Sequence, residues 1–361
     1  MLLWRAATMI PKPSSSFFRP TRGFRSQAAL DSLHSHAPSR TLVLYNYPSF
    51  SGAYAALFAH LYLSRLPLPF LPLPFSSVEP LRLEDFRSGG IETCYLLDFI
   101  GPNNFALGLS TIIPRVIAFD HRQSSLARVS KFEQCPENLE LRIDTNKSST
   151  RAVHDYFMER IAEMNAPLEE DRALVKGEYR DRVENVMRYI DDADLRQWEL
   201  PDIGAFNIGL KEVRPMLNCI TNPYVFEQLL EIDSGDLISK GKEYVSSRRV
   251  AASKLLGNAF KIRLGRGLYG ECLAIRADGN SDLSHEIALE LSSRSASAGL
   301  RPIGAVVFMQ RGNLKMCLRS TDSSIDTSEI AKAYGGGGNP NSSSFIIRMD
   351  EYNQWTAVNS C

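Results

Sequence analysis

Short apolar runs alternate with longer amphipathic segments in the first part of the chain. Residues 41–45, 94–98 and 115–121 have the length and composition of buried strands, and the last two end on Asp98 and on Asp120-His121. Residues 53–64 are apolar and long enough to form a buried helix. Strands that alternate with helices are typical of a mostly parallel sheet covered by helices. We therefore predict an α/β fold for this part of the chain.

The apolar stretch at residues 53–75 is long, and its polar and proline residues decide how it is interpreted. A membrane-spanning helix needs about 20 uninterrupted apolar residues. This stretch includes His60 and Arg65, and prolines break it at positions 67, 69, 72 and 74. We predict a buried helix followed by a proline-rich connector, and no contact with a membrane.

The second half of the chain is predicted to contain a helical region and then a smaller α/β domain. Helical periodicity extends over residues 149–166, 172–191 and 215–247. Apolar strand-like runs follow at residues 259–264, 271–276, 304–311 and 314–319. We expect a ligand cleft to lie between the two α/β domains.

Composition and charge are those of an ordinary globular protein. The chain has 361 residues, enough for two domains with separate cores, and 44% of them are apolar. Its 41 basic and 41 acidic residues cancel, so no global field favours nucleic acid and any anion site must be local. The six cysteines are scattered without a CxxC spacing, which favours reduced thiols over a disulfide framework or a zinc site.

The first 30 residues differ from the rest of the chain. They contain five basic residues and several serines, and no acidic residue occurs before Asp31. This composition is typical of an organelle transit peptide and favours the mitochondrion over the chloroplast; a disordered basic tail is the alternative. The predicted segments are a transit or disordered region at 1–38, a first domain at 39–214, a helical linker at 215–249 and a C-terminal domain at 250–361.

A glycine run near the C-terminus is the most informative local feature. Its four glycines lack a Cβ atom, so the backbone can approach a ligand closely and point several N–H groups at one anion. A strand that ends on Arg-Ser and a short predicted helix at 325–334 precede the run, and a strand at 344–347 follows it. A flexible surface loop is the alternative. As a phosphate cradle, these elements would use Arg319, Ser320, Gly336, Gly337, Gly338 and Asn339.

Polar side chains follow two of the predicted strands of the first domain. Asp98 comes at the end of one strand, and Asp120 and His121 at the end of another. Residues at the carboxyl ends of parallel strands meet in a ligand crevice, and carboxylates with imidazole suit Mn²⁺. Helix capping is the alternative role for each aspartate. A third acidic cluster at residues 191–194 ends a predicted helix, where its charge opposes the helix dipole and calls for compensation.

Taken together, these residues resemble the DHH phosphoesterase family with its DHH-associated C-terminal domain, over about residues 41–345. The order of motifs carries the resemblance more than any one of them. The matching segments are Leu-Asp-Phe-Ile-Gly-Pro at 97–102, Asp-His-Arg at 120–122, Asp-Ala-Asp-Leu at 192–195, residues 263–270, Leu-Arg-Ser at 318–320 and the glycine run. The resemblance implies a phosphoesterase fold with a two-metal centre, in which Asp120 and His121 are catalytic and Asp98, His121 and Asp192 bind metal.

The first metal-binding motif of that family has changed in this chain. Where active relatives supply a histidine and acidic residues, this sequence has Asn46, Ser49 and Ser51, which are poor ligands for a catalytic divalent ion. Arg122 stands where relatives place a second histidine, and we predict that it binds phosphate. Asn339 stands in place of a histidine after the glycines.

These departures predict a protein that binds phosphate better than it hydrolyses it. Loss of a charge stabiliser and of a general base would each lower the rate by roughly 10²-fold or more. We expect a catalytically impaired protein that binds a nucleotide or a short single-stranded oligonucleotide, with at most one weakly bound Mn²⁺ or Mg²⁺. A one-metal phosphoesterase and a non-enzymatic partner-binding module are the alternatives. The sequence neither supports nor excludes a homodimer.

Overall fold

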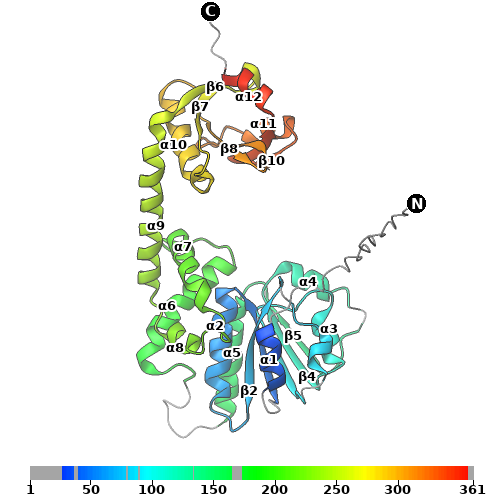
Figure 1. Ribbon diagram of the computed structural model, residues 1–361. Coiled ribbons are helices and arrows are strands. Elements are labelled where there is room, and N and C mark those ends of the chain that lie inside the picture. Colours follow the sequence, from blue (N-terminus) through cyan, green and yellow to red (C-terminus); the bar gives the residue numbers. More distant parts are fainter. Residues whose placement is uncertain are drawn as a thin grey trace, which may run out of the picture. The chain divides into compact units, whose positions relative to one another are not determined.

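The computed structural model describes residues 27–35, 40–78, 80–87, 90–132, 134–164 and 173–356. The chain forms two compact units that divide between Ile238 and Ser239 (Figure 1). This division lies inside helix α9, Ser234–Leu255, and within the segment predicted as a helical linker. Each unit has its own sheet and its own hydrophobic cores. The α/β fold with two domains is therefore confirmed, and the cleft between them stays a prediction.

The first unit contains a five-stranded sheet in the order β2-β1-β3-β4-β5. Every neighbouring pair is parallel. Side chains alternate between the faces of a strand, and in the central strands both sets are apolar. In β1, for example, Val43 and Tyr45 enter one core while Leu42 and Leu44 enter the other. The strands are β1 Thr41–Tyr47, β2 Phe70–Ser76, β3 Thr93–Leu97, β4 Arg115–Asp120 and β5 Leu139–Ile143.

The proline-rich connector predicted after the first helix is in fact a strand. β2 lies at the edge of the sheet, where Pro72 pairs with Val43 and Pro74 with Tyr45. Alternate residues of a strand direct their N–H groups to opposite sides, and an edge strand has a neighbour on only one of them. Proline lacks the N–H group that would donate to a neighbouring strand. At positions on the open side of an edge strand no such hydrogen bond is needed, and proline is tolerated there.

Helices cover both faces of this sheet (Figure 1). One core lies under α2 and the helices that follow the sheet in the chain, and the other lies under α1 and α3. None of the described helices is long and apolar enough to cross a membrane. The helices are α1 Gln27–Ser35, α2 Phe50–Leu63, α3 Phe105–Ser110, α4 Gln123–Val129, α5 Ser149–Glu163, α6 Gly177–Asp194, α7 Ile203–Val213 and α8 Val225–Leu230.

Helix α1 belongs to the segment predicted as a transit or disordered region. Its Ala29, Leu30 and Leu33 are buried in the same core as the edge strand β2. The folded unit therefore begins earlier than the sequence predicts. Residues 1–26 and 36–39 lie outside the described part of the chain, and the organelle assignment stays a prediction.

The second unit contains a six-stranded mixed sheet in the order β10-β11-β9-β8-β7-β6. Only β7 and β8 pair in parallel, and helix α10 connects them. One face packs under α11 and α12, and the other under α10 and the end of α9. The elements are β6 Phe260–Arg263, β7 Glu271–Arg276, α10 Ser284–Ser297, β8 Gly304–Gln310, β9 Asn313–Arg319, α11 Thr327–Ala333, β10 Gly337–Asn339, β11 Ser342–Ile347 and α12 Met349–Thr356.

The glycine run forms a turn and then a strand. Gly335, with φ +72°, follows the end of α11, and Gly337 and Gly338 belong to the edge strand β10. A Cβ atom on Gly336 would lie 2.3 Å from the backbone oxygen of Ser344, so this glycine allows the chain to pass close to β11. Close backbone packing thus explains part of the glycine run, for which the sequence predicts a phosphate cradle, with a flexible loop as the alternative.

Candidate functional site

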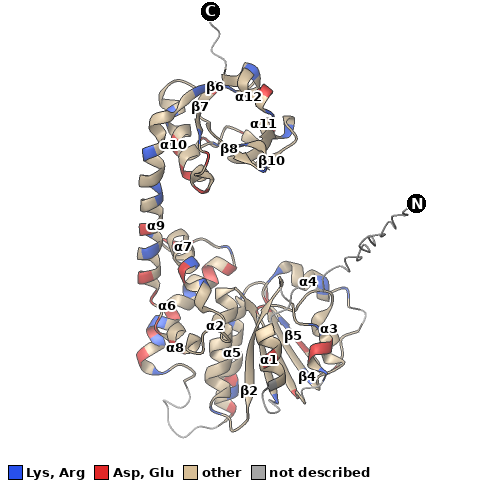
Figure 2. Cartoon of the chain, in the orientation of Figure 1, with Lys and Arg blue, Asp and Glu red and all other residues tan. Residues whose placement is uncertain are grey.

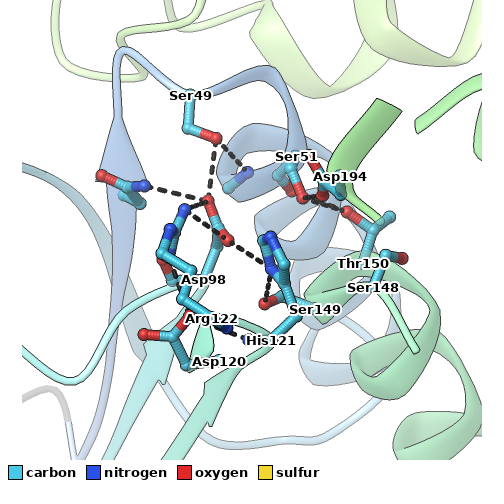
Figure 3. Close-up of polar contacts among 12 residues, drawn as sticks. Ser49, Ser51, Asp98, Asp120, His121, Arg122, Ser148, Ser149, Thr150 and Asp194 are labelled. Carbon is cyan, nitrogen blue, oxygen red and sulfur yellow. Dashed lines mark hydrogen bonds and ion pairs between the residues drawn. The ribbon is translucent and has the colours of Figure 1, made fainter. Parts of the chain in front are cut away.

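The predicted strand-end residues of the first unit come together at the carboxyl end of its sheet. β1, β3 and β4 are adjacent, so the segments that follow them meet. Asp98 directly follows β3, Asp120 ends β4, and Arg122 is the N-cap residue of α4. Figure 3 shows their side chains directed toward one another. We call Asp98, Asp120, His121 and Arg122 the carboxylate cluster.

Asp98 is fully buried, and protein donors surround its carboxylate. Its Oδ2 atom accepts hydrogen bonds from Asn46 Nδ2 at 2.9 Å and from Ser49 Oγ at 2.8 Å. Arg122 donates from one terminal nitrogen to Oδ1 at 3.0 Å and to Oδ2 at 3.2 Å. In the related proteins this motif is expected to bind a metal together with the aspartate. Here its residues Asn46 and Ser49 instead donate hydrogen bonds to Asp98.

Arg122 links the two aspartates of the cluster. Its other terminal nitrogen donates to Asp120 Oδ1 and to the backbone oxygen of Asp98, both at 2.8 Å. Asp120 also accepts from the backbone N–H groups of His121 and Arg122 and, at 2.6 Å, from Ser125 Oγ. The sequence predicted that Arg122 binds a phosphate. In the structure both terminal nitrogens are bonded to protein oxygens, and the phosphate role of Arg122 stays a prediction.

Of the acidic residues at 191–194, Asp194 reaches the site, and the predicted Asp192 does not. Asp194 accepts a hydrogen bond from Ser51 Oγ at 2.7 Å. Asp192 is buried but accepts from the backbone N–H groups of Glu199 and Leu200, so it closes the end of its own helix. Asp191 forms an ion pair with Arg151.

His121 contacts a serine and an aspartate through a single ring nitrogen. Its Nδ1 lies 2.9 Å from Ser149 Oγ and 3.4 Å from Asp98 Oδ1. A serine–histidine–aspartate nucleophile needs the two partners on opposite ring nitrogens. Ser149 is also fully buried at the start of α5. This arrangement therefore positions His121 and does not create a nucleophile.

The charges in the site shift the pKa values of Asp98, His121 and Asp194 in directions that the contacts explain. Burial raises the pKa of Asp98, but the hydrogen bond from His121 and the charge of Arg122 outweigh it and hold that pKa below its ordinary value. Burial lowers the pKa of His121, yet Asp98 and Asp194 raise it overall. Burial, and then the charge of Asp98, raise the pKa of Asp194 to about 6. Of Asp98 and Asp194, Asp98 is therefore the stronger acid.

The donor set does not fit a divalent metal ion. Ligand atoms of Asp98, Asp120 and His121 lie within 4.8 Å of one another, which is close enough to share an ion. However, the acceptor atoms of both carboxylates already face N–H and O–H groups, and the Arg122 guanidinium lies 3.0 Å from Asp98 and 2.8 Å from Asp120. A cation would have to displace these donors and approach a fixed positive charge. The expected ligand set of Asp98, His121 and Asp192 is not brought together.

A pocket of about 430 Å³ lies in the second unit, beside the predicted phosphate residues. It is lined by Arg319 and Lys315 of β9, by Gly337 and Gly338 of β10, and by Ser284 at the start of α10, with Asp282 just before that helix. Within the described residues, neither of the two cations forms an ion pair with a carboxylate. Arg319 instead lies 3.4 Å from His285 Nδ1 and donates to the backbone oxygen of Leu318.

Three of the predicted phosphate residues do not line this pocket. Ser320 is buried and donates to the backbone oxygen of Pro302 at 2.7 Å. Gly336 packs against β11, and its N–H group bonds to Ala331. Asn339 is exposed at the end of β10. The phosphate prediction is therefore retained here for Arg319, Gly337 and Gly338.

Sequence reasoning missed several residues of both sites. Ser149 and Thr150 bring fully buried hydroxyl groups from the start of α5 to His121 and Ser51. The polar run Ser148-Ser149-Thr150 before a helical segment was a capping signal that could have placed them near a ligand crevice. Lys315 could have been found from its spacing. It precedes Arg319 by four residues, with Cys317 between them, and alternate residues of a strand lie on the same face.

No protein-family model matches the chain, and no curated protein matches its sequence. Solved structures that align with it include an exopolyphosphatase-related protein from Bacteroides fragilis, at 14% identity, 91% coverage of this chain, 94% of that chain and a TM-score of 0.32. The pGpG-specific phosphodiesterase PggH from Vibrio cholerae aligns at 12% identity, with 87% and 95% coverage and a TM-score of 0.32. CDC45 from Entamoeba histolytica aligns at 10% identity, with 88% and 94% coverage and a TM-score of 0.34. Similarity at this level carries no argument about function.

Proposed function

We propose that this chain is a DHH phosphoesterase-like protein that binds a nucleotide or a short single-stranded oligonucleotide and does not hydrolyse it. The observation that carries the proposal is the contrast between the two polar sites. The carboxylate cluster of the first unit is satisfied by the protein itself. The pocket of the second unit has two cations without carboxylate partners among the described residues.

The pocket of the second unit has the chemistry of a phosphate site. Arg319 and Lys315 lie on the same face of β9 and both line it. Leu283 precedes α10 without a side-chain hydrogen bond to the helix start, and Ser284 of that start also lines the pocket. The N-terminus of a helix attracts anions. A volume of about 430 Å³ suits a ligand of nucleotide size.

A long nucleic-acid track is not supported. Lys and Arg are interleaved with Asp and Glu along both units, as Figure 2 shows. Proteins that follow a long strand combine a continuous basic groove with exposed aromatic side chains. The limited size of this pocket and the balanced charge favour a nucleotide or a short end of a strand over a long polymer.

The proposed loss of hydrolysis follows from the state of Asp98. A two-metal centre needs free carboxylate oxygens to hold its ions and to activate water. Asn46, Ser49 and Arg122 already donate to Asp98. Without an ion, the cluster has no group that generates a nucleophilic hydroxide.

One observation favours a second function, a one-metal phosphoesterase. Asp98, Asp120 and His121 place ligand atoms within 4.8 Å of one another. If Arg122 moved aside, these three side chains would offer two carboxylates and an imidazole, a set that suits Mn²⁺. Hydrolysis of a short RNA with added Mn²⁺, and its loss in Asp98→Ala, would support this function over the first.

The binding proposal is tested by titrating the purified full chain with adenosine 3′,5′-bisphosphate in a calorimeter. Arg319→Ala removes a charged donor, so we expect a loss of about 1.5–3 kcal/mol in binding free energy, or roughly 10- to 150-fold in Kd. Lys315→Ala should act in the same direction. Arg348→Ala is the matched control, because Arg348 is 85% exposed and pairs with Asp350 on the surface of the same unit.

Unchanged binding in both Arg319→Ala and Lys315→Ala would contradict the placement of the ligand. The same samples, incubated with Mn²⁺ and a short RNA, test the absence of turnover. Brisk hydrolysis that Asp98→Ala abolishes would overturn the proposal that the protein only binds. The two arms are independent, since one measures the second unit and the other the first.

A further inference from the structure

Buried carboxylates gather in the first unit with no solvent to stabilise their charge. Asp98 is 0% exposed and Asp120 is 3% exposed. Two like charges this close and this deeply buried need a cation within the site, since burial of an unpaired charge is very costly. The cluster has to contain that cation or bind one from solution.

Arg122 fills this role with the contacts expected of a bridging ion. Its guanidinium forms ion pairs with both carboxylates, at 3.0 Å to Asp98 and 2.8 Å to Asp120. It thereby joins the carboxyl ends of the neighbouring strands β3 and β4, as Figure 3 shows. The geometry is that of a charged clamp between two strands.

The backbone of Asp98 adds a second, independent observation. Asp98 has φ +66°, in the left-handed region, which is uncommon outside glycine although aspartate enters it more readily than most residues. In this conformation its backbone oxygen accepts a hydrogen bond from the same guanidinium that binds its carboxylate. Unusual backbone conformations persist where surrounding contacts impose them. Here Arg122 contacts both the backbone and the side chain of the unusual residue.

We infer that Arg122 is a permanent internal substitute for a divalent cation, and that its guanidinium is what prevents the carboxylate cluster from binding Mn²⁺. The inference concerns the same cluster as the proposed loss of hydrolysis. Its test, however, measures metal binding and unfolding without a substrate, so the two can fail separately. A protein that binds no Mn²⁺ until Arg122 is replaced would support it even if the ligand pocket of the second unit proved empty.

The experiment compares the wild-type full chain with Arg122→Ala and Arg122→Gln after removal of metals with a chelator. Free Mn²⁺ is measured by electron paramagnetic resonance during a titration, and thermal unfolding is followed with and without millimolar MnCl₂. Arg115→Ala is the control, because Arg115 begins β4, the strand that ends on Asp120, and pairs with Glu140 at 3.7 Å on the surface. The Gln variant retains donor groups in a neutral side chain, so it separates charge from hydrogen bonding.

We expect no saturable Mn²⁺ binding in the wild-type chain or in Arg115→Ala. Arg122→Ala should bind one Mn²⁺ at least about 100-fold more tightly than the wild-type chain does, because a full positive charge has been removed from the site. Its unfolding temperature should rise with MnCl₂, while that of the wild-type chain should not. If Arg122→Ala is unfolded without metal, a folding transition restored by MnCl₂ but not by NaCl supports the same conclusion.

Two results would overturn the inference. The first is stoichiometric Mn²⁺ binding by the wild-type chain with the affinity of Arg122→Ala. The second is a failure of both Arg122 variants to bind Mn²⁺ and to respond to it in thermal unfolding. Either result would show that the guanidinium is not what keeps the ion out of the cluster.

Discussion

Gly338 and Gly337 are neighbours in β10, and we predict a large loss of stability when Gly338 is replaced by alanine and almost none when Gly337 is. Gly338 has φ +145°, where a Cβ atom is strained. That atom would also lie 2.3 Å from the oxygen of Ser342 and 2.5 Å from the Cα of Ser343. At Gly337 a Cβ atom would meet nothing within 4 Å. The same change is therefore prohibited at one position and allowed at the next.

The cost at Gly338 can be estimated from what has to move. The clash involves the backbone of β11, which pairs with β10 over only three residue pairs. Relief requires the edge strand to separate from β11, with the loss of about two ladder bonds of roughly 1 kcal/mol each. The unfavourable backbone conformation adds about 1 kcal/mol or more. We expect Gly338→Ala to lower the free energy of unfolding by about 2–4 kcal/mol, and Gly337→Ala to change it by less than about 0.5 kcal/mol.

Trp355 allows this to be measured in the second unit alone. It is 1% exposed, and its ring centroid lies 5.0 Å from that of Tyr334, next to the glycine run. Urea unfolding followed by tryptophan fluorescence, in a background with Trp4 and Trp198 replaced by phenylalanine, reports on that unit. A lower midpoint at unchanged slope is the expected result for Gly338→Ala. Equal losses in both variants, or no loss in either, would refute the reasoning.

Two further predictions concern the first unit. Tyr45→Phe should lower its free energy of unfolding by about 1–3 kcal/mol, seen as a lower urea midpoint by circular dichroism, because the buried Tyr45 hydroxyl donates to Leu217 O and accepts from Cys219 N–H. Asp194→Asn tests the pKa of about 6 at Asp194. A carboxyl whose pKa is raised on folding binds its proton more tightly when folded, so its contribution to stability is present below about pH 4 and is lost as the pH rises through 6. The stability of the wild-type chain relative to Asp194→Asn should therefore fall by up to about 3 kcal/mol between these pH values; a constant difference would contradict the shift.

The apolar pattern predicted the fold where burial alone decides structure. β1, β3 and β4 are buried on both faces, so each appears in the sequence as an uninterrupted apolar run. The edge strand β2 was missed because prolines usually indicate a connector. The local sequence does not show that this strand lies at the edge of the sheet, where proline is tolerated. β10 was missed for a similar reason, since glycine is depleted in strands.

The candidate site was predictable to the level of topology and no further. Adjacent parallel strands bring Asp98, Asp120 and His121 together, as expected. Which aspartate at the end of α6 reaches the site depends on helix register, because successive residues turn by about 100°. The residues to which Arg122 forms ion pairs depend on the direction of its side chain, and this direction cannot be deduced from the sequence. A guanidinium beside two aspartates is equally consistent with a ligand and with an internal ion pair until the contacts are known.

The magnitudes explain why Arg122 and a divalent ion exclude each other. A doubly charged ion about 4 Å from the guanidinium would be repelled by about 8 kcal/mol at an effective dielectric constant near 20. A weak metal site, with a millimolar dissociation constant, supplies only about 4 kcal/mol. Binding would therefore require Arg122 to leave, and its hydrogen bonds to Asp98 and Asp120 are each worth about 1.5–3 kcal/mol. Asn46 and Ser49 would still donate to Asp98 Oδ2, so an ion that entered would gain at most one oxygen of that carboxylate. The free energy of binding a divalent ion to this cluster therefore becomes favourable only when Arg122 is removed.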